Sequence, residues 1–94
     1  MESSFVDYLS GGFLTAKGLS KAQKVIMQGL IDKAKDIITS SHGLSEDLTW
    51  EELINDYDIG IDEITSTLDT AFSEQSSTLT KALSLDWASI KSTY

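Results

Sequence analysis

The 94 residues include 15 acidic and 7 basic side chains, which give a formal net charge of −8 at neutral pH. The chain contains no Cys and no Pro, so neither disulfide bonds nor cysteine metal sites can stabilise it. All 7 basic residues are Lys, and the absence of Arg removes the usual bidentate ligand for phosphate. With this charge balance we expect no direct binding to nucleic acid.

Hydrophobic residues make up 40% of the chain, which is enough for a core, and none of their runs approaches the ~20 apolar residues of a membrane span. The first residues, Met1 to Phe5, lack the basic and apolar regions of a secretory signal. We therefore expect one small helical domain over residues 1–94, without a membrane segment. Its expected location is the cytoplasm, or a virion or other macromolecular particle.

Residues 1–18 are expected to form a short helix followed by a Gly-containing connector. Ser4 is a favourable N-cap, and Asp7 stands three residues later, in the capping-box position. The pair Gly11-Gly12 provides a stop signal for the helix. We expect this aromatic segment to cover the core, and docking on a neighbouring subunit is the alternative.

Residues 20–39 are expected to form a basic helix that begins at the N-cap Ser20. Its apolar side chains recur at helical spacing and cover nearly half of the circumference. They are Ala22, Ile26, Met27, Leu30, Ile31, Ala34, Ile37 and Ile38. A face this wide predicts a helix that packs on two sides, and Gly29 is expected to permit a close helix crossing.

Residues 45–60 are expected to form an acidic helix. Thr49 and Glu52 have the spacing of a capping box, in which each side chain caps the backbone N–H of the other residue. Glu51 and Glu52 fall in the first turn, where the helix dipole favours negative charge. Gly60 is expected to separate this helix from the next one.

Residues 61–94 contain neither Gly nor Pro, and their apolar residues recur every eleven positions. Ile61, Phe72, Leu83 and Tyr94 form one such series. Eleven residues make almost three turns of α-helix, so the series returns to the same side of the helix. The pattern predicts a long helix over about residues 61–92.

Polar residues interrupt this apolar stripe. The stretch Ser73–Thr78 is polar throughout, and Asp86 lies on the stripe itself. Polar residues on an apolar seam either specify its register or mark a break in the helix. The constant phase favours one continuous helix, and the alternative is a break near 76–78 that leaves two shorter helices, 61–75 and 78–92.

Together these segments predict an all-α fold. We expect a small helical bundle with a short N-terminal helix, a middle helix pair and a long C-terminal helix. A domain of this size buries only about 60–65% of its unfolded surface. Self-association is then an obvious additional source of buried area.

No group of residues predicts catalysis. His42 is the only histidine and stands in a turn of Ser and Gly residues. Without a Cys partner or a second His, we expect no metal site and no activated nucleophile. The chain is therefore expected to be no enzyme, with no catalytic or cofactor-binding residues, no cofactor and no small-molecule substrate.

Two acidic stretches resemble known loops. Asp56–Asp62 superficially resembles a calcium loop, but an EF-hand needs Gly at its sixth position and Glu at its twelfth, where Ile61 and Thr67 stand. Asp58–Ile64 resembles the D-L-G-x-D-S-L turn of acyl carrier proteins. The serine that carries phosphopantetheine in that family would fall on Glu63, so the resemblance implies no carrier chemistry.

The favoured hypothesis is a non-enzymatic assembly or interaction protein that acts through helix packing. It would work as a homo-oligomer or as a subunit of a larger particle, such as a viral or phage structural protein or an adaptor. Its partner would be itself or another protein, and the apolar stripe would form the interface. The stripe comprises Ile61, Ile64, Leu68, Phe72, Leu79, Leu83, Trp87, Ile90 and Tyr94.

The charge distribution supports an alternative hypothesis. From Asp36 to Thr80 the chain has eleven acidic residues and no Lys, whereas residues 1–35 contain five Lys and three acids. Such a chain suits an acidic inhibitor or nucleic-acid-mimicking decoy that binds a basic partner protein through Asp36–Glu74. The acidic face of this hypothesis comprises Glu51, Glu52, Asp56, Asp58, Asp62 and Glu63.

Overall fold

The computed structural model describes residues 2–74 and 79–93, and the side chains of residues 5–74 and 83–92 within them. Its helices, in chain order, are α1 (Glu2–Leu9), the short 3-10 helix η1 (Gly12–Thr15), α2 (Lys21–Ser41), α3 (Trp50–Asn55), α4 (Ile61–Ser73) and α5 (Leu79–Thr93). No strand occurs over these two ranges. The prediction of an all-α helical bundle is confirmed.

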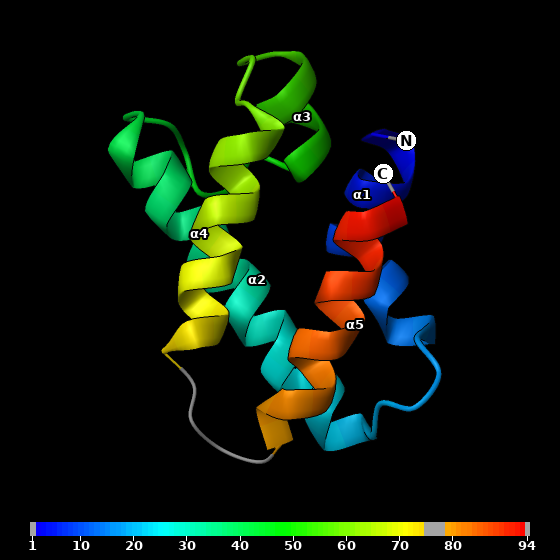
Figure 1. Cartoon of the computed structure of the whole chain (residues 1–94). Coiled ribbons are helices and arrows are strands. Elements are labelled where there is room, and N and C mark those ends of the chain that lie inside the picture. Colours follow the sequence, from blue (N-terminus) through cyan, green and yellow to red (C-terminus); the bar gives the residue numbers. More distant parts are fainter. Residues whose placement is uncertain (1, 75–78, 94) are drawn as a thin grey trace.

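The helix α2 is the centre of the bundle and contacts α4, α5 and η1. Figure 1 shows α4 and α5 running in opposite directions in front of α2, with α1 next to α5 and α3 at the end where α4 begins. The Cα radius of gyration is 12.7 Å, close to the ~12 Å of a compact chain of this length. The contacts of α2 with both α4 and α5 agree with the two-sided packing expected from its wide apolar face.

Side-chain caps fix the starts of α2 and α3. The Ser20 hydroxyl accepts a hydrogen bond from the Gln23 N–H at 3.1 Å, and the Gln23 side chain accepts one from the Ser20 N–H at 2.7 Å. Thr49 and Glu52 exchange the same two bonds at 3.1 and 3.0 Å, so the predicted capping box is confirmed. The hydrogen bond that the Gln23 side chain accepts was not predicted, although the spacing Ser-x-x-Gln is that of a capping box.

The apolar stripe of residues 61–94 is divided between two helices, which corrects the expectation of one continuous helix. The rings of Phe72 in α4 and Trp87 in α5 stack with their centroids 6.0 Å apart. In one straight helix the same residues would lie about 22 Å apart. The alternative of a break near 76–78 falls on residues outside those that the structure describes. The helix α4 ends at Ser73, and α5 begins at Leu79.

The core takes side chains from every helix, including the short ones. Among the completely buried residues are Phe5 of α1, Phe13 of η1, Leu53 of α3, Leu68 of α4 and Leu83 of α5. Burial of one such side chain stabilises the fold by about 1.5–3 kcal/mol. The N-terminal segment therefore contributes to the core of its own chain, as expected from its aromatic residues.

Two expectations for α2 are corrected by the packing. Ile37 is 46% exposed although it was assigned to the apolar stripe, because it lies about 100° around the helix from the buried Ile38. Ala22 is also exposed. A Cβ atom added at Gly29 would meet nothing within 4 Å, so none of the described helices crosses closely at that position.

Candidate functional site

The structure places most of the apolar stripe in the core of the same chain. Ile64, Leu68, Phe72, Leu83 and Trp87 are buried, none of them more than 6% exposed. Ile61 and Ile90 are partly buried and pack against these residues. The side chain of Leu79 and all of Tyr94 lie outside what the structure describes.

Trp87 is the residue around which α5 packs. Its indole is only 2% exposed. The ring centroids of Phe5 and Tyr8 lie 5.5 and 6.1 Å from that of Trp87, and Phe72 stacks on it from α4. These ring contacts join α5 to both α1 and α4, so the stripe stabilises the folded chain.

A carboxylate of α4 joins the two halves of the stripe. The Trp87 indole N–H donates a hydrogen bond to Asp69 Oδ1 at 2.7 Å, and Lys91 Nζ donates to the same oxygen at 2.8 Å. The Lys91 ammonium also lies 5.7 Å from the centroid of the Trp87 ring, within the range of a cation–π contact. The three side chains fix α5 against α4.

Asp86, the polar residue on the stripe, is explained by a contact with α1. Its carboxylate accepts a hydrogen bond from the Tyr8 hydroxyl at 2.6 Å. Burial raises the pKa of the Tyr8 hydroxyl well above its ordinary value, and the bond to Asp86 and the charge of that group raise it further. The signal in the sequence was one acidic residue on an apolar face, which predicted either a register-setting contact or a break and did not identify Tyr8.

The acidic face lies on α3, on the loop after it and on the start of α4. Glu51, Asp56, Asp58 and Asp62 are exposed. Within the described ranges, the salt bridges are Lys33–Glu74, Lys91–Asp69 and His42–Glu63, and none of them includes these four carboxylates. The other two carboxylates of the acidic face have partners within the chain. The Glu52 side chain accepts a hydrogen bond from the Thr49 N–H, and the Glu63 carboxylate lies 2.8 Å from His42.

Helix termini account for only part of this acidic face. Glu51 lies in the first turn of α3 and Asp62 in that of α4, where the helix dipole favours a carboxylate. Asp56 is instead the C-cap of α3, next to carbonyl oxygens that disfavour negative charge. Asp58 has a left-handed backbone with φ = 55°, a conformation in which Gly, Asn and Asp are all enriched. Neither Asp56 nor Asp58 lies in the first turn of α3 or α4, so the dipoles of these helix starts do not account for their charges.

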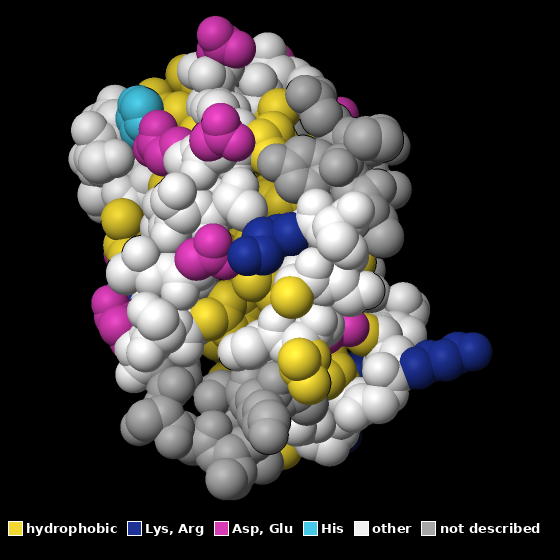
Figure 2. All heavy atoms as spheres, viewed as in Figure 1, with side chains coloured by type: hydrophobic (Ala, Val, Ile, Leu, Met, Phe, Trp, Pro, Cys, Tyr) yellow, Lys and Arg dark blue, Asp and Glu magenta, His cyan; other side chains and the backbone are white. Residues whose placement is uncertain are grey.

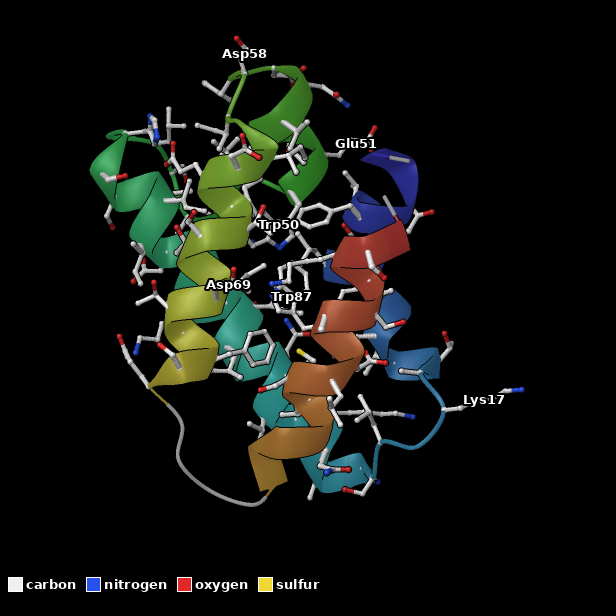
Figure 3. All side chains as sticks on the ribbon, in the orientation of Figure 1. Lys17, Trp50, Glu51, Asp58, Asp69 and Trp87 are labelled. Atoms are coloured by element: carbon white, nitrogen blue, oxygen red, sulfur yellow. The ribbon has the colours of Figure 1, made fainter. Side chains whose placement is uncertain are left out.

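Opposite charges lie at opposite ends of the bundle. Figure 3 shows Asp58 and Glu51 at the end formed by α3, and Lys17 at the other end, near the start of α2 where Lys21 stands. On the face drawn in Figure 2, acidic side chains gather near the single histidine, and a lysine projects at the opposite end. The longest dimension of the molecule is 34 Å, several times the Debye length of about 8 Å at physiological salt. A binding partner therefore meets the two ends as separate electrostatic surfaces.

A shallow pocket of about 210 Å³ lies between α1, α2 and the start of α3. Its lining includes the charged side chains Asp32 and Lys35 beside Trp50. This volume is smaller than the ~300 Å³ at which small-molecule pockets begin. In the described part of the chain, no group of three or more His, Asp or Glu residues is placed to hold a metal ion.

The described helices include none that is both long and apolar enough to cross a bilayer. Comparison with known proteins adds nothing to this description, since no protein-family model, curated protein or solved structure matches the chain.

Proposed function

We propose that this chain is a non-enzymatic interaction protein that binds a basic partner protein through the acidic end formed by α3 and its flanking loops. One observation carries the proposal: the carboxylates of Asp56 and Asp58 are exposed and lie outside the first turns of α3 and α4, and no salt bridge within the described ranges neutralises them. Charges that do not stabilise the fold are free to act on a partner.

The physical consequence of such a surface is electrostatic steering. Clustered carboxylates attract a Lys- and Arg-rich surface, raise the rate of association and disfavour acidic partners. An exposed carboxylate contributes only about 0–1 kcal/mol per contact, so the affinity depends on several of them acting together. The proposal therefore predicts binding that weakens steeply as salt is added.

Calorimetric titration with a synthetic oligolysine peptide, at low and at physiological salt, tests the proposal. The test variant is Asp56→Asn/Asp58→Asn, which neutralises the two carboxylates that carry the proposal and in which Asn suits the left-handed backbone of residue 58. The matched control is Asp7→Asn/Asp32→Asn, because it has the same net charge and changes exposed acids of α1 and α2. We expect the test variant to bind about fivefold more weakly than the wild type, and the control to bind nearly as well as the wild type. Equal losses in both variants would mean that only total charge matters, and would overturn the proposal.

Assembly into a homo-oligomer or a larger particle, such as a virion, is the second candidate. The observation that favours it is the constant phase of the apolar residues over 61–94. Two separate short helices would not need to share one phase. Because the stripe lies in the core of its own chain, assembly through it requires the two helices to separate. High salt distinguishes the two candidates, since apolar contacts persist when charge contacts are screened.

A further inference from the structure

We propose that a groove beside α2 binds a short segment of the basic partner, in which an apolar side chain stands next to a lysine or an arginine. The inference rests on the proposed function, because it states which part of a basic protein would dock beside the acidic end. The groove consists of two adjoining hollows of about 210 and 220 Å³. Each is smaller than the ~300 Å³ at which small-molecule pockets begin, so each suits one side chain of a protein.

One side of α2 lines both hollows. The residues that it contributes recur at the spacing of a single helix face. They are Gln28, Ile31, Asp32, Lys35 and Asp36. Asp32 and Lys35 belong to both hollows, which therefore adjoin along the helix. Neighbouring residues of one extended segment can reach the two hollows at the same time.

Bonds within the chain fix the other walls of the groove. The first hollow is also lined by the end of α1 and the start of α3, and the second by the loop between α2 and α3. The capping box of Thr49 and Glu52 fixes the start of α3. The Leu44 N–H donates a hydrogen bond to the Thr39 carbonyl at 2.8 Å, which ties the loop to α2. Walls that are already fixed lower the entropy cost of binding a partner.

The first hollow suits an apolar side chain. Its lining includes three apolar side chains that belong to the core, namely Leu9, Ile31 and Trp50. Its charged side chains are one carboxylate and one ammonium, those of Asp32 and Lys35, so they sum to zero. The Asp32 carboxylate also accepts a hydrogen bond from Gln28 at 2.8 Å. A leucine or an aromatic residue of the partner would therefore cover apolar atoms without meeting an excess of charge.

The second hollow suits a cation. Four carboxylates line it, those of Asp32, Asp36, Glu46 and Asp47. Lys35 supplies its one ammonium, which leaves an excess of three negative charges, and no salt bridge within the described ranges includes any of these side chains. A lysine or an arginine brought here meets several carboxylates at once, whereas an anion is repelled. The difference in charge between the two hollows therefore places the apolar side chain in the first and the basic one in the second.

Two fluorescently labelled hexapeptides of equal charge, Lys-Lys-Leu-Leu-Lys-Lys and Lys-Lys-Ser-Ser-Lys-Lys, test the groove by anisotropy titration at physiological salt. We expect the wild type to bind the leucine peptide at least about tenfold more tightly, because a leucine leaves water in the first hollow. Ser10→Trp and Gln28→Trp each place a bulky side chain at this hollow and should remove the preference. The matched control is Ser66→Trp on the exposed side of α4, which should keep it.

Lys35→Met tests the sign of the charge that the groove binds. The substitution removes the one ammonium of the second hollow, so both peptides should bind about threefold more tightly. Weaker binding of the peptides by Lys35→Met would mean that the groove takes an anion, and would overturn the proposal. Equal affinities of the wild type for the two peptides, or a leucine preference that both Trp variants of the hollow keep, would also overturn it.

The same peptides separate a failure of the groove from a failure of the proposed function. Asp56→Asn/Asp58→Asn should weaken the binding of both peptides equally and leave the leucine preference unchanged. If this variant binds more weakly but the wild type shows no leucine preference, the groove is wrong and the acidic interaction surface stands. If the preference is present but this variant binds like the wild type, the groove stands and the role of Asp56 and Asp58 is wrong. Binding of neither peptide would overturn both.

Discussion

Trp87 of α5 donates its indole hydrogen bond to Asp69 of α4, and the two atoms lie 2.7 Å apart. The bond joins residues whose helices follow one another in the chain and run in opposite directions in space. Lys91 donates to the same carboxylate oxygen at 2.8 Å. One carboxylate thus fixes the position of the whole C-terminal helix.

Removal of this carboxylate is expected to destabilise the fold. Asp69→Ala leaves the buried Trp87 indole N–H without its acceptor, which should lower the free energy of unfolding by about 1–2 kcal/mol. Asp69→Asn keeps an acceptor oxygen for the indole, and Lys91→Met removes only a half-exposed ion pair. Each of these two substitutions should lower the free energy of unfolding by less than about 1 kcal/mol. Urea unfolding followed by circular dichroism measures all three. Equal losses of unfolding free energy in Asp69→Ala and Lys91→Met would show that the hydrogen bond from Trp87 to Asp69 does not stabilise the fold.

The Tyr8–Asp86 pair predicts a loss of stability at alkaline pH. The pKa of Tyr8 in the folded chain is raised above the ordinary value of 10.0 by burial, and next by its bond to Asp86. The neutral hydroxyl therefore contributes its full stability below about pH 10, and this stability is lost as the pH rises from there toward the folded-state pKa. Tyr8→Phe should lower the free energy of unfolding at neutral pH and reduce the extra loss above pH ~10.

Tyr57→Phe is the control for this pH dependence, because the Tyr57 side chain is 47% exposed. Its free energy of unfolding should follow that of the wild type across the alkaline range. If Tyr8→Phe and the wild type lost stability in parallel above pH ~10, the buried hydroxyl would not be the group responsible.

Two glycines should respond in opposite ways to alanine. At Gly29 an added Cβ meets nothing within 4 Å, so Gly29→Ala should stabilise the chain by about 0.5–1 kcal/mol through helix propensity. At Gly12 the added Cβ would lie 2.8 Å from the backbone oxygen of Asp7, so Gly12→Ala should destabilise it. Thermal unfolding measures both. Destabilisation by Gly29→Ala would indicate a close contact of α2 that the bundle does not contain.

Asp56 should show a conflict between stability and binding. As the C-cap of α3 it places a carboxylate where the helix terminus disfavours one. Asp56→Asn should therefore raise the free energy of unfolding by about 0.3–1 kcal/mol while it weakens binding to the oligolysine peptide. A variant that is less stable than the wild type would mean that the carboxylate has a structural role.

Local signals in the sequence predicted part of the helical pattern, while long-range pairing was not predictable. The predicted N-cap Ser4 lies inside α1, and the helix expected over residues 45–60 is limited to Trp50–Asn55. The capping box of Thr49 and Glu52 acts over three residues, so its spacing alone revealed it. The reversal between α4 and α5 had only a weak signal, the polar stretch Ser73–Thr78, because the apolar phase is the same on both sides of it and neither Gly nor Pro marks a turn. The same phase suits one helix or two, and the choice depends on the contacts of Trp87 with residues far away in the chain.

The acidic face was predictable as a set of residues, but its meaning depended on the structure. Glu51 and Asp62 fall in the first turns of α3 and α4, where the helix dipole accounts for their charge. The backbone at Asp58 and the position of Asp56 at a helix end became visible only in the folded chain. Composition alone could not separate charges that stabilise the helices from charges left for a partner.

The central claim is that the apolar stripe is the core of a single chain and that the charged ends remain available for binding. Light scattering of the freshly purified protein at micromolar concentration, in low and in high salt, tests this most directly. The account predicts a mass of 10.3 kDa under both conditions. A multimer that persists in high salt at this dilution would contradict it, because the apolar side chains would then be shared between chains from the start.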